Sequence, residues 1–312
     1  MLLFQADPDR IQATLELLTG VAPLDGAVVE SRAVGHPDHD RVAAWLAADA
    51  WPDIAVEVQE SDGLTNVIGE LPGEGPPIVL CAHWDSTATS TDGWREATDP
   101  APGADDDASG VAVVLEAARL LALHAPGFRR TVRFVLFDGE ERGLLGSTAY
   151  VDGLDEDVGL AFCLDPVGYN PGGESILWVA YDSLGADAAE AVLETAESID
   201  VDLEVYPADS EAWGGDTRSD HAPFAAADMP ALHGGSFPQP STYHTTGDTL
   251  DVVDQAYTTE VATLAATHIA ALAEPLEEAE PEETDPTGCG CATGGSPAWL
   301  GLLVAGWVRR RR

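Results

Sequence analysis

The sequence contains no lysine: all 14 of its basic residues are arginines, and 55 acidic residues oppose them in a chain of 312. The formal net charge of −41 argues against binding to nucleic acid, because an acidic surface repels a polyanion. Binding of the folded surface to an anionic membrane is disfavoured for the same reason. Since 45% of the residues are apolar, we nonetheless expect a folded core.

Cysteine is also scarce, with four residues in two pairs. Cys289 and Cys291 lie close to the C-terminus, whereas Cys81 and Cys163 lie inside apolar runs. We interpret Cys81 and Cys163 as buried free thiols. A disulfide between them is the alternative, and it requires a proximity that the sequence does not show.

The end of the chain differs in composition from the rest. We predict a folded domain over residues 1–273, an acidic Pro/Glu-rich linker over 274–288 and a tail over 289–312. The tail combines the two cysteines, an apolar stretch at 292–308 and four terminal arginines. This stretch lies at the lower limit of length for a membrane span, and the arginines would face the cytoplasm.

This order of features resembles the myxobacterial C-terminal sorting signal. The resemblance implies export, processing near the cysteines and anchoring at the cell surface or outer membrane. Residues 1–7 are too short and too acidic for a secretory signal, so the export hypothesis requires a start codon upstream of Met1. The alternative is a frayed tail without an anchoring role.

Short apolar runs alternate with helical patterns in the body of the chain. We predict strands at residues 78–82, 132–137, 160–164 and 176–181, and helices at 10–18, 110–123, 186–199 and 258–273. This alternation predicts a single α/β domain whose central, mostly parallel mixed sheet is flanked by helices on both faces. Ligands of such sheets bind at the carboxyl ends of the strands.

Histidine and carboxylate side chains follow the first three predicted strands or lie in adjoining loops. They are His83 and Asp85, Glu140 and Glu141, Asp165, the acidic run 105–107, and His244. Zinc accepts imidazole nitrogen and carboxylate oxygen, and carboxylates packed together require cations to offset their repulsion. The sequence therefore predicts a zinc site at this edge of the sheet.

The segments that carry these residues resemble the di-zinc aminopeptidase family of secreted bacterial leucyl aminopeptidases, a zinc exopeptidase fold. They are HWDS, APGADDDASG, DGEERGLLGS, CLDPVGY and YHTTGDTLD, and they occur in the family's order between about residues 66 and 273. The resemblance implies two zinc ions bridged by Asp106 and a water or hydroxide. His83 and Asp165 would complete one zinc site, and Glu141 and His244 the other.

The same resemblance assigns the remaining roles. Glu140 would be the general base, and Asp85 would orient the ring of His83. Tyr243 would help to stabilise the oxyanion, with simple packing as the alternative. The implied substrates are peptides with a free N-terminus, cleaved by a monomeric catalytic domain that contacts a membrane only through its tail.

Some features depart from the family or leave a different interpretation open. Pro166 stands where relatives usually carry a larger apolar residue, so the preferred N-terminal residue stays undecided. We expect His36 and His39 to be solvent-exposed and His221 to be structural. Glutaminyl cyclases share a DGEE segment but use a single zinc, and the full GADDDASG loop favours two metals and hydrolysis. The sequence is also compatible with another zinc exopeptidase and with a surface-binding ectodomain that lacks catalytic activity.

Overall fold

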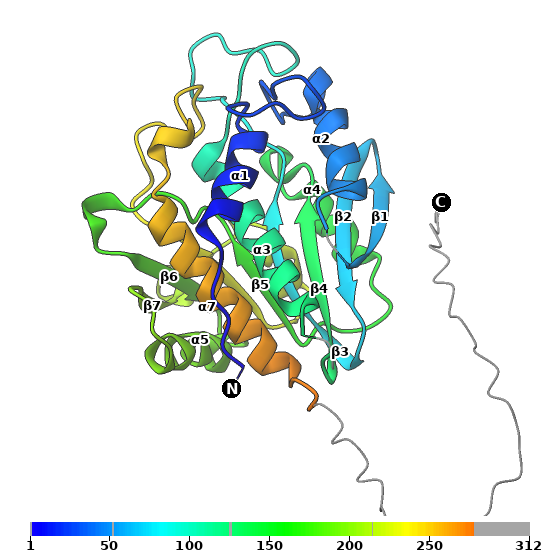
Figure 1. Ribbon diagram of the computed structural model, residues 1–312, viewed down its shortest axis with the longest axis vertical. Coiled ribbons are helices and arrows are strands. Elements are labelled where there is room, and N and C mark those ends of the chain that lie inside the picture. Colours follow the sequence, from blue (N-terminus) through cyan, green and yellow to red (C-terminus); the bar gives the residue numbers. More distant parts are fainter. Residues whose placement is uncertain (1, 52, 125–126, 214, 278–312) are drawn as a thin grey trace, which may run out of the picture.

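The computed structural model describes residues 2–51, 53–124, 127–213 and 215–277, which form one eight-stranded sheet with helices on both faces (Figure 1). The strands are β1 (Ala55–Ser61), β2 (Leu64–Leu71), β3 (Glu74–His83), β4 (Arg130–Phe137), β5 (Leu160–Leu164), β6 (Ile176–Tyr181), β7 (Glu204–Asp209) and β8 (Ala231–Gly235). The helices are α1 (Pro8–Leu18), α2 (Pro37–Ala48), α3 (Gly110–Ala122), α4 (Leu145–Asp152), α5 (Ala186–Ser198), α6 (His221–Ala226) and α7 (Gln255–Ala273).

The centre of the sheet is parallel and its edges are mixed. In the order β1-β2-β4-β3-β5-β8-β6-β7, strands β4, β3, β5 and β8 run parallel to their neighbours in this group. Antiparallel pairing joins β1 to β2, β2 to β4, and β8 to β6. The carboxyl ends of β3, β4 and β5 therefore meet at one edge, as the predicted α/β class requires, and that class is confirmed.

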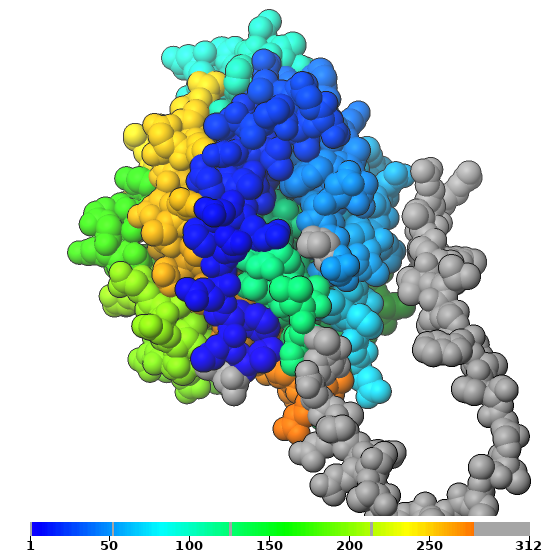
Figure 2. Space-filling model, in the orientation of Figure 1, coloured from blue at the N-terminus to red at the C-terminus, as the bar shows by residue number. Residues whose placement is uncertain are grey.

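Each face of the sheet has its own apolar core, because successive residues of a strand point to opposite sides. On β3, Leu80 and Ala82 belong to the larger core, which also contains residues of α1, α3, α5 and α7. Val79 and Cys81 face the smaller core with Tyr150 of α4 and Phe224 of α6. Figure 1 shows α1, α3 and α7 on the same side of the sheet, and Figure 2 shows the N-terminal residues running along that side.

Every helix and strand predicted from the sequence is present, with ends shifted by a few residues. The hairpin β1–β2 was not predicted, although its turn at Asp62 and Gly63 has both residues in the left-handed region (φ 50° and 84°) that Asp-Gly turns adopt. Strands β7 and β8 and helices α2, α4 and α6 were also not predicted.

The predicted linker and tail fall mostly outside the described residues. Of the linker, 274–277 is described, and its first residues contact the turn before β4: Arg129 N donates to Glu274 O (2.9 Å) and Leu276 N to Gly127 O (3.0 Å). The tail at 289–312, with its predicted membrane segment, lies beyond the described part. Within that part, no helix has the length and apolarity needed to cross a membrane.

Candidate metal centre

The ends of three neighbouring strands and two loops bring the predicted site residues together. His83 is the last residue of β3, and Asp165 directly follows β5. Glu140 and Glu141 lie in a short helical turn after β4, which begins at Gly139 with φ 71°. A Cβ at Gly139 would lie 2.8 Å from the Leu64 side chain, so both the backbone and the space favour glycine there.

Asp106 lies between the two predicted histidines. Its Oδ1 is 3.0 Å from Nε2 of His83, and its Oδ2 is 3.0 Å from Nε2 of His244. Asp165 Oδ1 lies 3.4 Å from the same nitrogen of His83, and Glu141 Oε2 lies 3.3 Å from that of His244. The side chains thus form two groups that share one carboxylate, with a different oxygen turned toward each group.

Asp85 lies behind His83 and fixes the ring. Nδ1 of His83 lies 3.2 Å from the backbone oxygen of Asp85 and 3.3 Å from its carboxylate. Because these oxygens only accept, Nδ1 carries a proton toward them, so Nε2, which faces Asp106, is the ring nitrogen that could bind a metal ion. The carboxylate also accepts hydrogen bonds from the backbone of Glu140 (3.1 Å) and Glu141 (3.3 Å), so it joins the two strand ends.

The donor atoms fit a bound cation. Nε2 of His83 faces a carboxylate oxygen of Asp106, a contact that is favourable only with a proton or a metal ion between the two atoms. Oδ2 of Asp106 and Oε1 of Glu141 are buried and accept no hydrogen bond in the structure, although Nε2 of His244 is close to the former. Buried polar atoms without partners are costly, so the nitrogen and oxygen set suits zinc.

Electrostatics in the absence of metal support the same conclusion. Burial, together with the carboxylates of Asp165 and Asp220, raises the pKa of Glu140 to about 11 against the opposing effect of His83. Burial and the neighbouring carboxylate of Asp106 likewise raise the pKa of Glu141. Too many carboxylates converge for all of them to ionise without added positive charge.

Three further carboxylates hold the acidic loop of residues 104–109: Asp105 and Asp107, which belong to the predicted acidic run, and Asp248, to which the sequence assigned no role. Asp248 accepts hydrogen bonds from the backbone of Asp105 (3.0 Å) and Asp106 (3.1 Å). Oδ1 of Asp105 accepts from the backbone of Tyr169 (2.7 Å), and Oδ2 of Asp107 accepts from that of His83 (3.2 Å). The GADDD and TGD sequences contain these residues, but nothing in the sequence shows which carboxylate points at metal and which at backbone.

Tyr243 stacks on the ring of His244, with centroids 3.8 Å apart and an interplanar angle of 20°. It is 36% exposed, and burial of the rest together with nearby carboxylates raises its pKa, so that the hydroxyl keeps its proton. The structure therefore leaves open both the packing role and the role of a donor.

The prediction that His36 and His39 are solvent-exposed is wrong. His39 is buried: its Nε2 lies 2.9 Å from Oδ1 of Asp138, and its ring lies against Trp84, with centroids 4.4 Å apart and planes tilted by 32°. His36 is buried as well and caps α2 by accepting a hydrogen bond from Asp38 N (3.2 Å). The polar sequence around them is the first turn of α2, and the partner of His39 is distant in the chain.

A second histidine and carboxylate cluster adjoins the first. Asp216 Oδ2 is 2.8 Å from Nδ1 of His233, and Nε2 of His233 donates to the backbone oxygen of Asp165 (2.5 Å). Arg218 donates to both oxygens of Asp216, at 2.8 Å and 3.1 Å. His221, expected to be structural, is buried, donates to the backbone oxygen of Asp216 (3.1 Å) and stacks on His233.

A cavity of about 460 Å³ adjoins this second cluster, because Asp216 and Arg218 are among the residues that line it. Trp178, Phe237 and Arg218 line it, and the guanidinium of Arg218 sits 4.9 Å from the centre of the Phe237 ring. A Cβ at Gly235 would meet both the Asp165 backbone oxygen and the Phe237 ring, which shows how closely this wall approaches the strand end.

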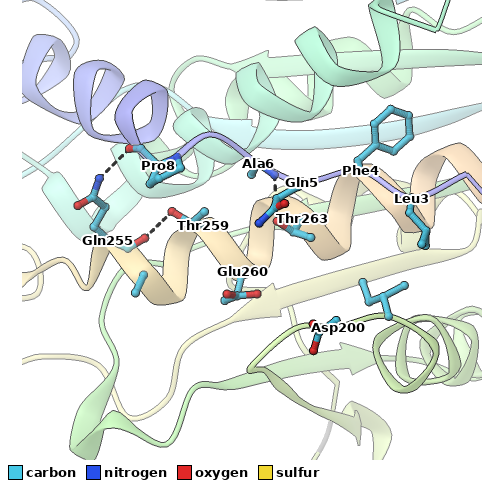
Figure 3. A pocket seen from close by; sticks show the side chains of 12 residues that line it. Leu3, Phe4, Gln5, Ala6, Pro8, Asp200, Gln255, Thr259, Glu260 and Thr263 are labelled. Carbon is cyan, nitrogen blue, oxygen red and sulfur yellow. Dashed lines mark hydrogen bonds between the residues drawn. The ribbon is translucent and has the colours of Figure 1, made fainter.

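A larger cavity, of about 620 Å³, lies between residues 3–8, α7 and the end of α5 (Figure 3). None of the predicted site residues lines it. Cys81 and Cys163, opposite each other on β3 and β5, are buried free thiols in the structure, as predicted.

Comparison with known proteins decides the family. The sequence profile of Peptidase family M28 matches residues 66–269. The chain belongs to this peptidase family.

Three proteins illustrate the sequence similarity of this M28 chain to known relatives. It is 27% identical over 278 residues to the uncharacterized protein YfbL of Escherichia coli (strain K12), covering 79% of this chain and 82% of YfbL. It is 34% identical over 192 residues to the aminopeptidase YwaD of Bacillus subtilis (strain 168), covering 58% and 38%. A probable zinc metalloprotease of Pyrenophora tritici-repentis (strain Pt-1C-BFP) is 40% identical over 88 residues, covering 27% and 17%. The matches thus span well under half of YwaD and of the fungal protein.

Solved structures share the fold. The LapA aminopeptidase of Legionella pneumophila matches with a TM-score of 0.73 at 23% identity, covering 87% of this chain and 73% of LapA. A glutaminyl cyclase of Bacteroides thetaiotaomicron matches with a TM-score of 0.70 at 21% identity, covering 86% of this chain and 99% of the cyclase. The scaffold therefore supports two reactions, and only the site can decide between them.

Proposed function

We propose that this M28 chain is a metal-dependent aminopeptidase that removes N-terminal residues from peptides with two zinc ions. The observation that carries the proposal is the pair of ligand groups that share Asp106. His83, Asp106 and Asp165 would hold one ion, and Asp106, Glu141 and His244 the other. When bound, the two ions lower the pKa of a water molecule and polarise the scissile carbonyl.

Glu140 is the general base in this proposal. It is nearly buried, and one of its carboxylate oxygens lies within 4.8 Å of donor atoms of His83 and Glu141. Its own carboxylate is not needed by either ligand group, so it remains available to take the proton of the attacking water and return it to the leaving amine. Asp85 keeps the His83 ring and the turn of Glu140 in place.

The remaining residues act on the substrate. Tyr243, whose hydroxyl stays protonated, would donate a hydrogen bond to the developing oxyanion. The cavity lined by Trp178, Phe237 and Arg218 would receive the side chain of the N-terminal residue. The excess of acidic groups favours a protonated amino terminus over a carboxylate end. The catalytic domain would act as a monomer.

The test is hydrolysis of leucine p-nitroanilide by the full chain, assayed with zinc, after chelation, and in Glu140→Gln. We expect activity only with metal, and a loss of roughly 10²–10⁴-fold in the variant. Glu140→Gln should still bind two zinc equivalents, which separates loss of the base from loss of the site. Glu156→Gln, an exposed partner of Arg133 on another part of the surface, is the control and should retain activity.

Different outcomes would identify a different function. Two bound zinc ions without hydrolysis would favour a narrower exopeptidase. One zinc ion together with cyclisation of N-terminal glutamine would favour a glutaminyl cyclase, the activity named for one protein of the same fold. Failure to bind metal tightly would favour a binding ectodomain without catalytic activity.

We also infer from the tail sequence that the protein is exported and anchored at the cell surface or outer membrane. The supporting feature is the order of cysteines, apolar stretch and terminal arginines over 289–312. Fractionation of the native cells tests this proposal, and recovery of the protein only from the cytosol would refute it.

A further inference from the structure

The N-terminal part of the chain, which precedes the region matched to the family, is fastened to the rest of the domain. Residues 3–8 run along α7, where Ala6 N donates to Thr263 Oγ1 (3.1 Å) and Gln255 Nε2 donates to Pro8 O (2.7 Å) (Figure 3). Further along, the segment between α1 and α2 reaches the strand ends that carry the metal centre. Its buried side chains are therefore in a position to act on that centre.

Arg32 lies in this segment, and its cationic side chain is fully buried. Its Nε donates to the backbone oxygen of Trp84 (2.7 Å), and its Nη2 donates to that of Gly103 (2.9 Å). Nη1 donates to the backbone oxygens of Pro102 (2.5 Å) and Leu18 (3.0 Å). In the described part of the chain it forms no ion pair, so its partners are carbonyl groups from three separate segments.

Two of these segments carry residues of the metal centre. Trp84 lies between His83 and Asp85, and Gly103 opens the loop that contains Asp106. Gly103 has φ 52°, and a Cβ there would lie 2.9 Å from Nη2 of Arg32, so the loop approaches the guanidinium as closely as glycine permits. A planar group with fixed donor directions thus sets the spacing between the end of β3 and the acidic loop.

The backbone and the charge of Arg32 reinforce this arrangement. Arg32 N donates to Ser86 Oγ (3.1 Å), and Ser86 Oγ donates to Ala101 O (2.8 Å), which ties the same two segments a second time. Burial lowers the pKa of Arg32, but the carboxylates of Asp248 and Asp107 oppose this effect, and a guanidinium stays protonated in proteins. Its positive charge also offsets part of the repulsion among the acidic groups.

We propose that Arg32 is a positioning residue of the metal centre, holding the end of β3 and the acidic loop so that His83 and Asp106 meet over one metal ion. The inference rests on the proposed function only in so far as that function requires the metal. In the described part of the chain, the Arg32 side chain donates only to backbone oxygens and to none of the proposed ligand atoms. It acts through the backbones of Trp84 and Gly103, and its removal should change metal affinity before it changes anything else at the site.

The chain offers a matched control in Arg41. This arginine also donates to backbone oxygens, those of Leu24 (2.7 Å) and Val28 (2.5 Å), and it pairs with Asp38. It holds the loop before Arg32 but touches no segment that carries a ligand. An arginine with a purely structural role should therefore behave like Arg41 when it is replaced.

The experiment compares Arg32→Lys and Arg32→Gln with Arg41→Lys and Arg41→Gln in the full chain. Zinc dissociation constants are measured by competition with a chromogenic chelator, absorption spectra are recorded with Co²⁺, and unfolding in urea is followed for the metal-free proteins. We expect the Arg32 variants to bind zinc roughly 10–100-fold more weakly and to show an altered Co²⁺ spectrum. The Arg41 variants should lose some stability and keep the wild-type affinity and spectrum.

Unchanged zinc affinity and Co²⁺ spectrum in Arg32→Lys and Arg32→Gln would overturn the proposal, whatever their stability. An equal loss of affinity in the Arg32 and Arg41 variants would overturn it too, because a general effect of destabilisation would then suffice. If Arg32→Gln does not fold, Arg32→Lys decides, since it keeps the charge but has a single donor nitrogen. Failure of the wild type to bind metal would instead refute the proposed function.

Discussion

Two clusters of histidine and carboxylate side chains adjoin one another in this protein, and they balance their charges in different ways. In the Asp216 cluster, made up of Asp216, Arg218, His221 and His233, the carboxylate is paired with an arginine and a histidine, and the other nitrogen of His233 donates to a carbonyl. In the cluster around Asp106, carboxylates outnumber cationic partners, and within the described residues the buried Oδ2 of Asp106 and Oε1 of Glu141 accept no hydrogen bond.

The difference shows that donor type and proximity alone do not define a metal centre. Both clusters contain three or more potential ligands within 4.8 Å of one another. Around Asp216 the protein supplies its own cation, and His233 and Arg218 outweigh burial to hold the pKa of Asp216 well below its usual range. Around Asp106, the histidines His83 and His244 also lower the pKa of the central carboxylate, but burial and neighbouring carboxylates raise the pKa values of Glu140 and Glu141 in spite of His83. A bound metal ion would supply the positive charge that these two groups lack. In the described part of the chain, Nδ1 of His221 is buried without a hydrogen-bond partner, a feature that the Asp216 cluster shares with the metal centre.

Neutralising the central carboxylate of each cluster should give the largest difference between the two clusters. Asp106→Asn should lose zinc binding and activity by more than the roughly 10–100-fold expected for an outer hydrogen-bonding partner, because it removes a ligand shared by both ions. Asp216→Asn should keep zinc affinity within about threefold, since it contributes no ligand. Metal analysis and leucine p-nitroanilide hydrolysis measure both. Equal losses in the two variants would contradict the distinction.

The stability of the metal-free protein should respond to pH through the excess carboxylates. Burial raises the pKa of Asp248 to about 6 and that of Asp220 to about 7, above the usual value of 3.8. The folded form therefore binds protons that the unfolded form has released, so the free energy of unfolding should fall as pH rises from about 4 to 7. Each carboxyl should contribute at most roughly 1.4 kcal/mol to this fall per pH unit between its unfolded and folded pKa values. Bound zinc should make the free energy of unfolding less dependent on pH over this range.

Urea denaturation with a chelator or with zinc, at several pH values in this window, measures the effect. A metal-free stability that rises with pH would contradict the account. The Asp216 cluster should behave in the opposite sense, because a lowered carboxylate pKa gives stability that is lost only as pH falls through it.

A smaller effect is expected at His233, which connects the two clusters. His233→Gln weakens the hydrogen bond to the backbone of Asp165, so zinc affinity should fall by about tenfold. His221→Asn is the matched control: it changes a stacked, buried histidine whose hydrogen bond goes to the backbone of Asp216. Zinc affinity should stay within about twofold while stability falls by about 1 kcal/mol. Competition with a chelator measures the zinc affinity of both variants. A larger loss of zinc affinity in His221→Asn than in His233→Gln would contradict this prediction.

The sequence predicted what depends on local pattern and on motif order. The apolar runs of β3, β4 and β5 and the helical spacing of α3 were sufficient to predict the central strands of the sheet. The residues after those strands converge, as the parallel strand order requires. The side chains of the two ligand groups were all selected from the sequence. Their roles as ligands and base remain predictions until metal is measured.

What the sequence did not predict depends on contacts between distant segments. His39 lies in a polar stretch, yet it is buried against Asp138, which is 99 positions away in the chain. Arg32 has no local signal at all, because its partners are backbone oxygens from three segments. Backbone carbonyls are present at every residue, so no pattern of side chains reveals which of them an arginine will reach.

The most direct measurement is a crystal structure of the zinc-loaded protein with anomalous scattering data at the zinc edge. The account predicts two zinc peaks, one among His83, Asp106 and Asp165 and the other among Asp106, Glu141 and His244, with no peak at Asp216, His221 and His233. A single peak, or a peak in the Asp216 cluster, would contradict it.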